Sequence, residues 1–236
     1  MCTKDQTLAN NGAGRNEGEE HMARCNGLSQ KEGQDIMGDN FLSIEAVEKS
    51  FRIRFTPEES EALAEIPYTE NTLRACKNTH LLFPGYPLKI PYIVRRSQWR
   101  NQKLFDTQLN SWCTQPVFAG GHQRFFQYER VCLRWYLTSR DIVAESTNKT
   151  YEKQRTLLWP NEFVPNATEM IYTITLCYLA TNVRLFERIY ARTVSVCDDR
   201  RIMVGFFGPN GLRVGCGMGY MCDRSENIGL ASSYHH

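Results

Sequence analysis

The sequence has no hydrophobic run long enough to cross a membrane as a helix, no Cys-x-x-Cys pair, and no sustained heptad or Gly-X-Y repeat. A spanning helix needs about 20 predominantly apolar residues, and the longest apolar-rich stretch, residues 170–180, has about half that length. These absences exclude a helical membrane protein, a coiled coil and collagen. What remains is the composition of a globular domain, with 42% hydrophobic and 11% aromatic residues.

Neither sign of charge dominates, because the formal net charge at pH 7 is only +2. So small a charge gives no reason to expect a nucleic-acid or membrane partner. The N-terminus has no apolar stretch that could serve as a signal peptide. The nine cysteines are an odd set without paired spacing, and several lie in apolar patterns. We therefore expect a reduced, cytoplasmic protein without disulfides.

Residues 1–40 contain no Phe, Trp or Tyr, and they are rich in glycine and acidic side chains. Such a segment buries too little apolar surface to offset the entropy lost on ordering. The sequence therefore predicts a disordered leader over residues 1–40 and a single domain over residues 41–236.

Three helices have recognisable start signals. Thr56 and Glu59 form a capping box around Pro57, which predicts a helix ending near residue 66. Asn166 and Glu169 form a second capping box, and the apolar positions that follow predict a long helix buried nearly all round. Thr150 can cap a short helix through residue 158.

Strands are expected mainly towards the C-terminus. Residues 131–139 alternate as a half-buried strand does, whereas the prolines within residues 79–92 favour an extended surface segment. Residues 188–196, 202–207, 212–214 and 228–232 are short strand candidates, and residues 208–211 have the composition of a tight turn. Helices followed by an antiparallel meander indicate an α+β fold.

Catalytic and metal sites have little support in the sequence. Cys113 and His122 could form a thiol–imidazole pair, but no third residue is indicated to orient the base. Cys216 and Cys222 lack the second pair that a zinc site needs. We expect no metal and no cofactor. The basic residues 95–103 surround Trp99 and offer a nucleic-acid-binding alternative, although a solvated loop is commoner.

Residues 215–227 (GCGMGYMCDRSEN) show neither alternation nor a helical period, although strand-like segments flank them. Binding residues concentrate on loops that a rigid scaffold holds, and Tyr, Ser, Gly and Asn are typical of adaptable binding loops. The candidate ligand-binding residues are Gly215, Cys216, Met218, Tyr220, Met221, Asp223, Arg224, Ser225, Glu226 and Asn227. A flexible surface loop is the simpler alternative.

The phrases THLLFPGYPL, LRWYLTSRDIVAESTNKTYEKQ, IYTITLCYLATNVRLFERIYAR and VGFFGPNGLRV, followed by IGLAS, resemble a family of uncharacterised proteins from uncultivated bacteria. The resemblance covers residues 71–233. Its layout is similar to that of the variable proteins of diversity-generating retroelements, whose C-terminal region changes at adenine positions and which fold like C-type lectins. Adenine changes in AAY codons reach every residue type of residues 215–227 except those of Met218, Met221 and Glu226.

The resemblance implies a non-enzymatic, C-type-lectin-like module that binds a protein or another macromolecule through residues 215–227. Two features depart from the pattern, since Ile228-Gly229-Leu230-Ala231 replaces an Ile-Gly-Phe-Arg ending and no Gly-Gly-Ser-Trp element occurs upstream. No lectin-type calcium motif is present, so the fold would imply binding in general rather than sugar binding. The enzyme alternative is similar in fold to formylglycine-generating enzymes, with Cys216 and Cys222 as the thiol pair that holds copper.

Overall fold

The computed structural model describes residues 27–99, 103–106, 126, 128–197, 200–216 and 224–235. Its elements follow in the order β1 (Leu28–Ser29), α1 (Gln30–Met37), the 3₁₀ helix η1 (Gly38–Asn40), α2 (Ile44–Phe51), α3 (Pro57–Ala62), β2 (Glu65–Ile66), α4 (Glu70–Cys76), β3 (His80–Pro84), α5 (Ile90–Ser97), β4 (Trp135–Ser139), α8 (Tyr151–Arg155), β5 (Glu162–Phe163), α9 (Ala167–Thr181), β6 (Tyr190–Cys197), β7 (Arg200–Gly208), β8 (Gly211–Cys216), β9 (Ile228–Leu230) and β10 (Ser233–Tyr234). The mixture of helices and largely antiparallel sheets confirms the α+β class.

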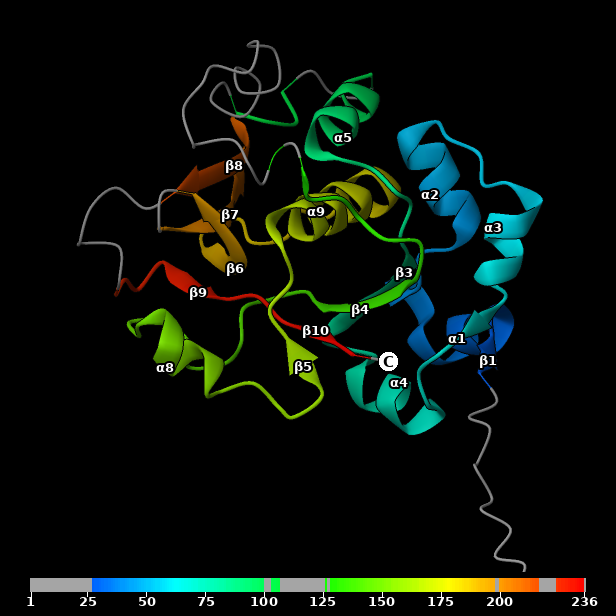
Figure 1. Cartoon of the computed structure of the whole chain (residues 1–236), viewed down its shortest axis with the longest axis horizontal. Helices are drawn as coiled ribbons and strands as arrows, with labels where there is room; N and C mark the ends of the chain where they lie inside the picture. The colour runs from blue at the N-terminus through cyan, green and yellow to red at the C-terminus, as the bar shows by residue number, and fades with distance from the viewer. Residues whose placement is uncertain are drawn as a thin grey trace, which may run out of the picture.

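Two four-stranded sheets carry the architecture (Figure 1). The first has the strand order β3-β4-β10-β5, and the second has the order β8-β7-β6-β9. The expected C-terminal meander is right for β6, β7 and β8, which pair antiparallel. It is wrong for β9, which pairs parallel to β6 with Tyr190 opposite Ile228. A parallel neighbour needs a crossover, and the chain between β8 and β9 joins opposite edges of the sheet.

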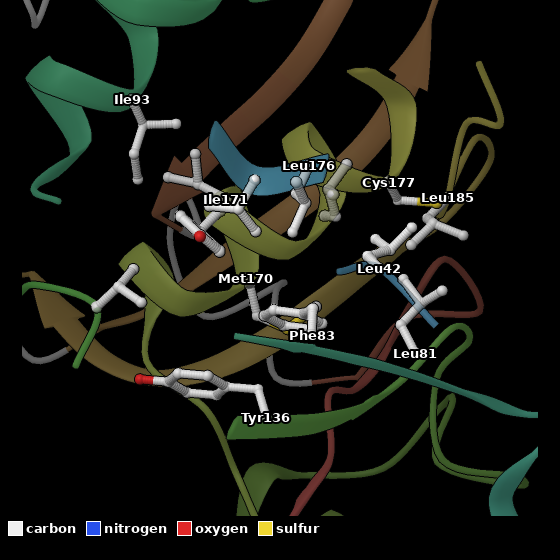
Figure 2. Packing of buried hydrophobic residues seen from close by; sticks show 14 of the residues in the cluster. Leu42, Leu81, Phe83, Ile93, Tyr136, Met170, Ile171, Leu176, Cys177 and Leu185 are labelled. Carbon is white, nitrogen blue, oxygen red and sulfur yellow. The ribbon is translucent and has the colours of Figure 1, made fainter. Parts of the chain in front are cut away.

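Helix α9 is the centre of the core. It packs against α2, α5, β6 and β7, and in Figure 1 it lies between the second sheet and the two helices. Figure 2 shows Phe83 of β3 between Met170 of α9 and Tyr136 of β4. The Phe83 and Tyr136 rings stack with their centroids 5.5 Å apart, and the Tyr172 hydroxyl donates to Pro84 O at 3.1 Å. The expected burial of this helix on nearly all sides is confirmed.

The N-terminus of α9 is bonded to both sheets, to the first through the Glu169 carboxylate and to the second through the N–H of Ala167. Asn166 and Glu169 form the predicted capping box, in which Glu169 Oε2 accepts from the backbone N–H of Asn166 at 2.9 Å. Glu169 Oε1 accepts from the Tyr136 hydroxyl at 3.1 Å and from Arg134 Nη2 at 3.4 Å, both on the β4 side. On the other side the N–H of Ala167 donates to Ser195 Oγ of β6 at 2.7 Å.

Some predicted boundaries are wrong. The leader cannot extend to residue 40, because residues 27–40 form β1, α1 and η1, with Ser29 capping α1 and Leu28 pairing with Ile66; residues 1–26 lie outside the described residues. Helix α3 has the predicted capping box but ends at Ala62, because β2 pairs with β1 immediately afterwards.

Two other segments are more buried than their patterns indicated. Residues 79–92 do not form a surface segment, since β3 lies at the edge of the first sheet with all five residues buried. Pro84 is tolerated because it ends this edge strand. The predicted half-buried strand 131–139 is β4, whose Trp135, Tyr136, Leu137 and Thr138 are all buried. Both faces of the first sheet are therefore covered.

Replacing Glu169 with Ala should lower the free energy of unfolding by about 3–5 kcal/mol, because Arg134 and the Tyr136 hydroxyl would lose their acceptor in a buried place. Urea unfolding measures this change. The matched control is Glu61→Ala in the exposed part of α3, which should change stability by less than about 0.5 kcal/mol. Equal effects of the two substitutions would contradict the structural role of Glu169.

Candidate functional site

The 215–227 segment begins on β8, at one edge of the second sheet. Gly215 lies opposite Met203 and Cys216 opposite Ile202 in the antiparallel pairing with β7. The outer edge of β8 is held as well, since the N–H of Leu212 donates to Leu104 O at 2.8 Å. The strand that leads into the segment is thus held on both sides.

The end of the segment is tied to three different parts of the chain. Ser225 O accepts from the N–H of Asn148 at 3.0 Å, and Asn227 O accepts from the N–H of Tyr190 at 2.8 Å. Strand β9 follows at once in parallel register with residues 190–192 of β6. Its other edge is covered too, because Leu230 O accepts from the N–H of Val143 at 2.9 Å.

A buried polar network beneath this end involves α8. The Gln154 side chain is fully buried, and its Nε2 donates to Ser146 O at 2.7 Å and to Ile228 O at 3.3 Å. Its Oε1 accepts from Arg192 Nη1 at 2.9 Å, and Ser146 Oγ accepts from the N–H of Leu230 at 2.9 Å. Satisfied buried networks restrict a structure to one arrangement, because breaking any bond leaves a polar group unsatisfied.

The candidate binding residues divide between described and undescribed positions. Arg224, Glu226 and Asn227 are exposed, whereas Gly215, Cys216 and Ser225 are partly exposed. Met218, Tyr220, Met221 and Asp223 lie outside the described residues. Cys216 and Arg224 flank the undescribed part: Cys216 is the last residue of β8 and Arg224 precedes β9, and these two strands are at opposite edges of one sheet.

A row of three residues that the sequence patterns did not indicate lies next to both ends of the 215–227 segment. Tyr190, Gly205 and Arg213 are in register across β6, β7 and β8, and Tyr190 is also opposite Ile228. Burial raises the pKa of Tyr190, an effect that the nearby Arg213 opposes without cancelling it. A Cβ at Gly205 would lie 2.1 Å from Ile189 O, so this position requires glycine. The alternation of the strands could have indicated the outward direction of Tyr190 and Arg213.

The catalytic alternatives gain nothing from the described residues. Cys113, His122 and Cys222 lie outside them, so neither the thiol–imidazole pair nor the paired-cysteine enzyme can be assembled from the described residues. Within the described ranges, no group of three or more His, Cys, Asp or Glu side chains could hold a metal ion. No described helix is long and apolar enough to cross a membrane.

The basic run at residues 95–103 is partly helical, because Arg95 and Arg96 form the last turn of α5. Arg96 Nη1 donates to Arg52 O at 2.7 Å, at the C-terminus of α2. The Arg52 guanidinium lies 4.0 Å from the centroid of the half-exposed Trp99 ring. Cations at helix C-termini are favoured by the helix dipole, so these charges have a structural explanation.

His80 of β3 is a buried histidine, and its environment keeps it neutral. Its side chain is 10% exposed, and burial lowers its pKa to about 4. An unfolded chain binds a proton at this imidazole near pH 6.5, whereas the folded chain does so only near pH 4. The stability that depends on neutral His80 is therefore complete above pH 6.5 and is lost as the pH falls towards 4.

This titration predicts that the wild-type protein loses roughly 2–3 kcal/mol of unfolding free energy between pH 6.5 and pH 4 through His80 alone. The His80→Gln variant should lack that contribution, so its stability should depend less steeply on pH. Urea unfolding of both proteins at several pH values measures the difference. Parallel pH profiles would show that His80 titrates normally in the folded state.

Comparison with known proteins adds no relative, since no protein-family model, curated protein or solved structure matches this chain. Function is therefore inferred from the contacts and exposure of the residues described above.

Proposed function

We propose that this chain is a non-enzymatic recognition module that contacts a protein or another macromolecule through residues 215–227. The observation that carries the proposal is the fixation of both ends of this segment. β8 is held from both edges, and Ser225, Asn227 and Leu230 are bonded to residues 143–148 and to Tyr190. Binding loops held by a rigid scaffold lose less entropy when they engage a partner.

The exposed chemistry next to the fixed ends supports the same function. Arg224, Glu226 and Asn227 offer a cation, an anion and an amide to a partner. Tyr190 of β6 and Arg213 of β8 add an aromatic ring and a cation on the same sheet. Tyrosine and arginine are enriched in protein interfaces because they combine large contact areas with hydrogen bonding. The fixed row would orient the partner, and the 215–227 segment would select it.

We further propose that the domain is C-type-lectin-like and that the segment is diversified by a retroelement. The support is the sequence layout together with an α+β order in which helices precede the second sheet. The side chains of residues 216–224, 226 and 227 would vary, because Asn227 fixes the end through its backbone oxygen, whereas Ser225 would stay constant. Ser225 belongs to the fixed set because its carbonyl accepts from Asn148 and its Oγ accepts from the N–H of Asn227 at 3.1 Å.

A display library tests the binding function. Positions 216–224, 226 and 227 are randomised while Ser225 is kept, and the library is selected against hen lysozyme as a probe protein. We expect micromolar binders whose melting temperatures lie within about 5 °C of the wild type, because surface substitutions usually change stability by less than about 0.5 kcal/mol each.

The matched control library randomises the same number of exposed positions in α3, in α4 and in the chain between these helices. Binders that arise equally often from this control would contradict a specialised recognition segment. A loss of more than about 10 °C in most variants of the first library would show that the segment is part of the core.

The retroelement origin is tested on DNA. The region flanking the gene should contain a near-copy of codons 213–233 that differs only at adenines and lies beside a reverse-transcriptase gene. Sequencing the flanking region checks this expectation. Its absence would remove the diversification proposal but would leave the binding proposal to the library.

A further inference from the structure

A cleft of about 880 Å³ opens on a part of the surface to which no described residue of the 215–227 segment contributes. Its walls come from the end of β4 and the chain after it (residues 139–144), from residues 157–162 before and within β5, and from residues 183–189 after α9. Volumes of several hundred Å³ are typical of sites for small ligands. The cleft is independent of the proposed recognition function.

One wall of the cleft contains a buried imidazole nitrogen without a partner. His80 Nδ1 lies 2.8 Å from the Thr79 hydroxyl, whereas His80 Nε2 makes no hydrogen bond. Nine-tenths of the side chain is buried. Buried polar atoms are nearly always hydrogen-bonded, so an exception on the wall of a cleft points to a missing partner.

A buried carboxylate lies beside this nitrogen. Glu162 is only 6% exposed through its side chain, and its Oε1 is 4.0 Å from His80 Nε2, too far for a hydrogen bond. Its Oε2 accepts from the N–H of Trp159 at 2.9 Å. Among the described residues, no lysine or arginine forms an ion pair with Glu162. Oε1 and the imidazole nitrogen therefore face each other without a bonded group between them.

The groups around Glu162 do not neutralise its charge. His80 is neutral at pH 7 because burial lowers its pKa to about 4. Burial also raises the pKa of Cys76 and that of Tyr234, the latter to about 12, and the Glu162 carboxylate contributes to both shifts. A carboxylate with little access to water is costly unless a cation pairs with it, and Glu162 has no bonded cation among the described residues.

The rest of the cleft is suited to an apolar group. Trp159 is 71% exposed and Val183 is 42% exposed, although both have large apolar side chains. Leu157 and Ile142 continue the apolar wall. A ligand with a charged end at Glu162 could bury an apolar stem against these side chains.

We propose that this cleft binds a primary ammonium group on an apolar stem, with Glu162 Oε1 and His80 Nε2 accepting its hydrogen bonds. An ammonium has three N–H donors, so it can satisfy both acceptors at once. The imidazole can accept at Nε2 when its proton is on Nδ1, where the Thr79 oxygen receives it. The ion pair then supplies the positive charge that Glu162 lacks.

Two arginines of the cleft decide which amines fit best. Arg140 Nη1 donates to Asn40 Oδ1 at 2.8 Å, and Arg184 lies 5.5 Å from the ring centroids of both Tyr178 and Phe207. Within the described chain neither guanidinium forms an ion pair with a carboxylate. A free amino acid would offer its carboxylate to them, whereas a simple amine or a lysine side chain would not.

The test uses the full-length protein and phenethylamine as the probe, followed by isothermal titration and by NMR of the His80 ring. We expect a single site with Kd roughly 0.1–1 mM for so small a ligand, together with a shift of the His80 Nε2 signal. Phenethyl alcohol, the neutral analogue, should bind at least about tenfold more weakly. No saturable binding of the amine, or equal binding of the alcohol, would overturn the proposal without any variant being made.

The variants assign the binding to Glu162. Glu162→Gln keeps an oxygen for the N–H of Trp159 but removes the charge, and it should weaken phenethylamine binding by more than about tenfold. Glu187→Gln, on the exposed part of the same cleft, is the matched control and should change binding by less than about twofold. A loss in the control but not in Glu162→Gln would overturn the assignment.

Phenylalanine then distinguishes the sources of the amine. Binding at least as tight as that of phenethylamine identifies amino acids as the ligand class, with the carboxylate directed to the arginines. Weaker binding identifies simple amines or lysine side chains. Either result supports the ammonium site. Equal binding of phenylalanine and phenylpropionate, which has no amine, would overturn the proposal.

Discussion

The N-terminus of α9 is the point on which both sheets depend. The Glu169 carboxylate closes the capping box with Asn166 and at the same time accepts from Tyr136 and Arg134 on the side of the first sheet. Two residues earlier, the N–H of Ala167 donates to Ser195 Oγ of β6. The Ser195 hydroxyl donates in turn to Glu129 Oε2 at 2.7 Å. A helix start that carries these bonds cannot rotate or shift without breaking contacts to both sheets. The helix that follows packs against β6 and β7 of the second sheet, and its Tyr172 contacts Phe83 and Pro84 of β3 in the first.

The chain after the candidate segment provides a second connection between the sheets. β9 belongs to the second sheet and β10 to the first, and only Ala231 and Ser232 separate them. Ala231 donates to Arg192 O on one side, and Ser232 O accepts from the N–H of Ser139 on the other. The residues that end the 215–227 segment are therefore part of the framework itself.

The proposed amine cleft and the proposed recognition segment lie at different places in the same framework. The cleft is lined by the ends of β3 and β4, whereas the segment joins β8 to β9. The cleft brings together residues distant in sequence, since His80 and Glu162 come from separate strands of the first sheet. Neither residue type nor spacing in the sequence indicates this pair, which only the buried, unpartnered His80 Nε2 beside the Glu162 side chain identifies.

What the sequence determined by itself is local. Thr56, Thr150 and Asn166 each start a helix because their side chains accept from an N–H three residues ahead, and residues 208–211 turn between β7 and β8. The irregular composition of residues 215–227 distinguished the segment from its neighbours but did not indicate which contacts hold its ends. The tertiary structure decided the parallel pairing of β9, the ordering of residues 27–40 by pairing with β2, and the approach of Ser146 and Gln154 to β9. These features depend on contacts between residues far apart in the chain. The favourable free energy of such contacts comes from many residues that are buried together, and no short sequence pattern encodes it.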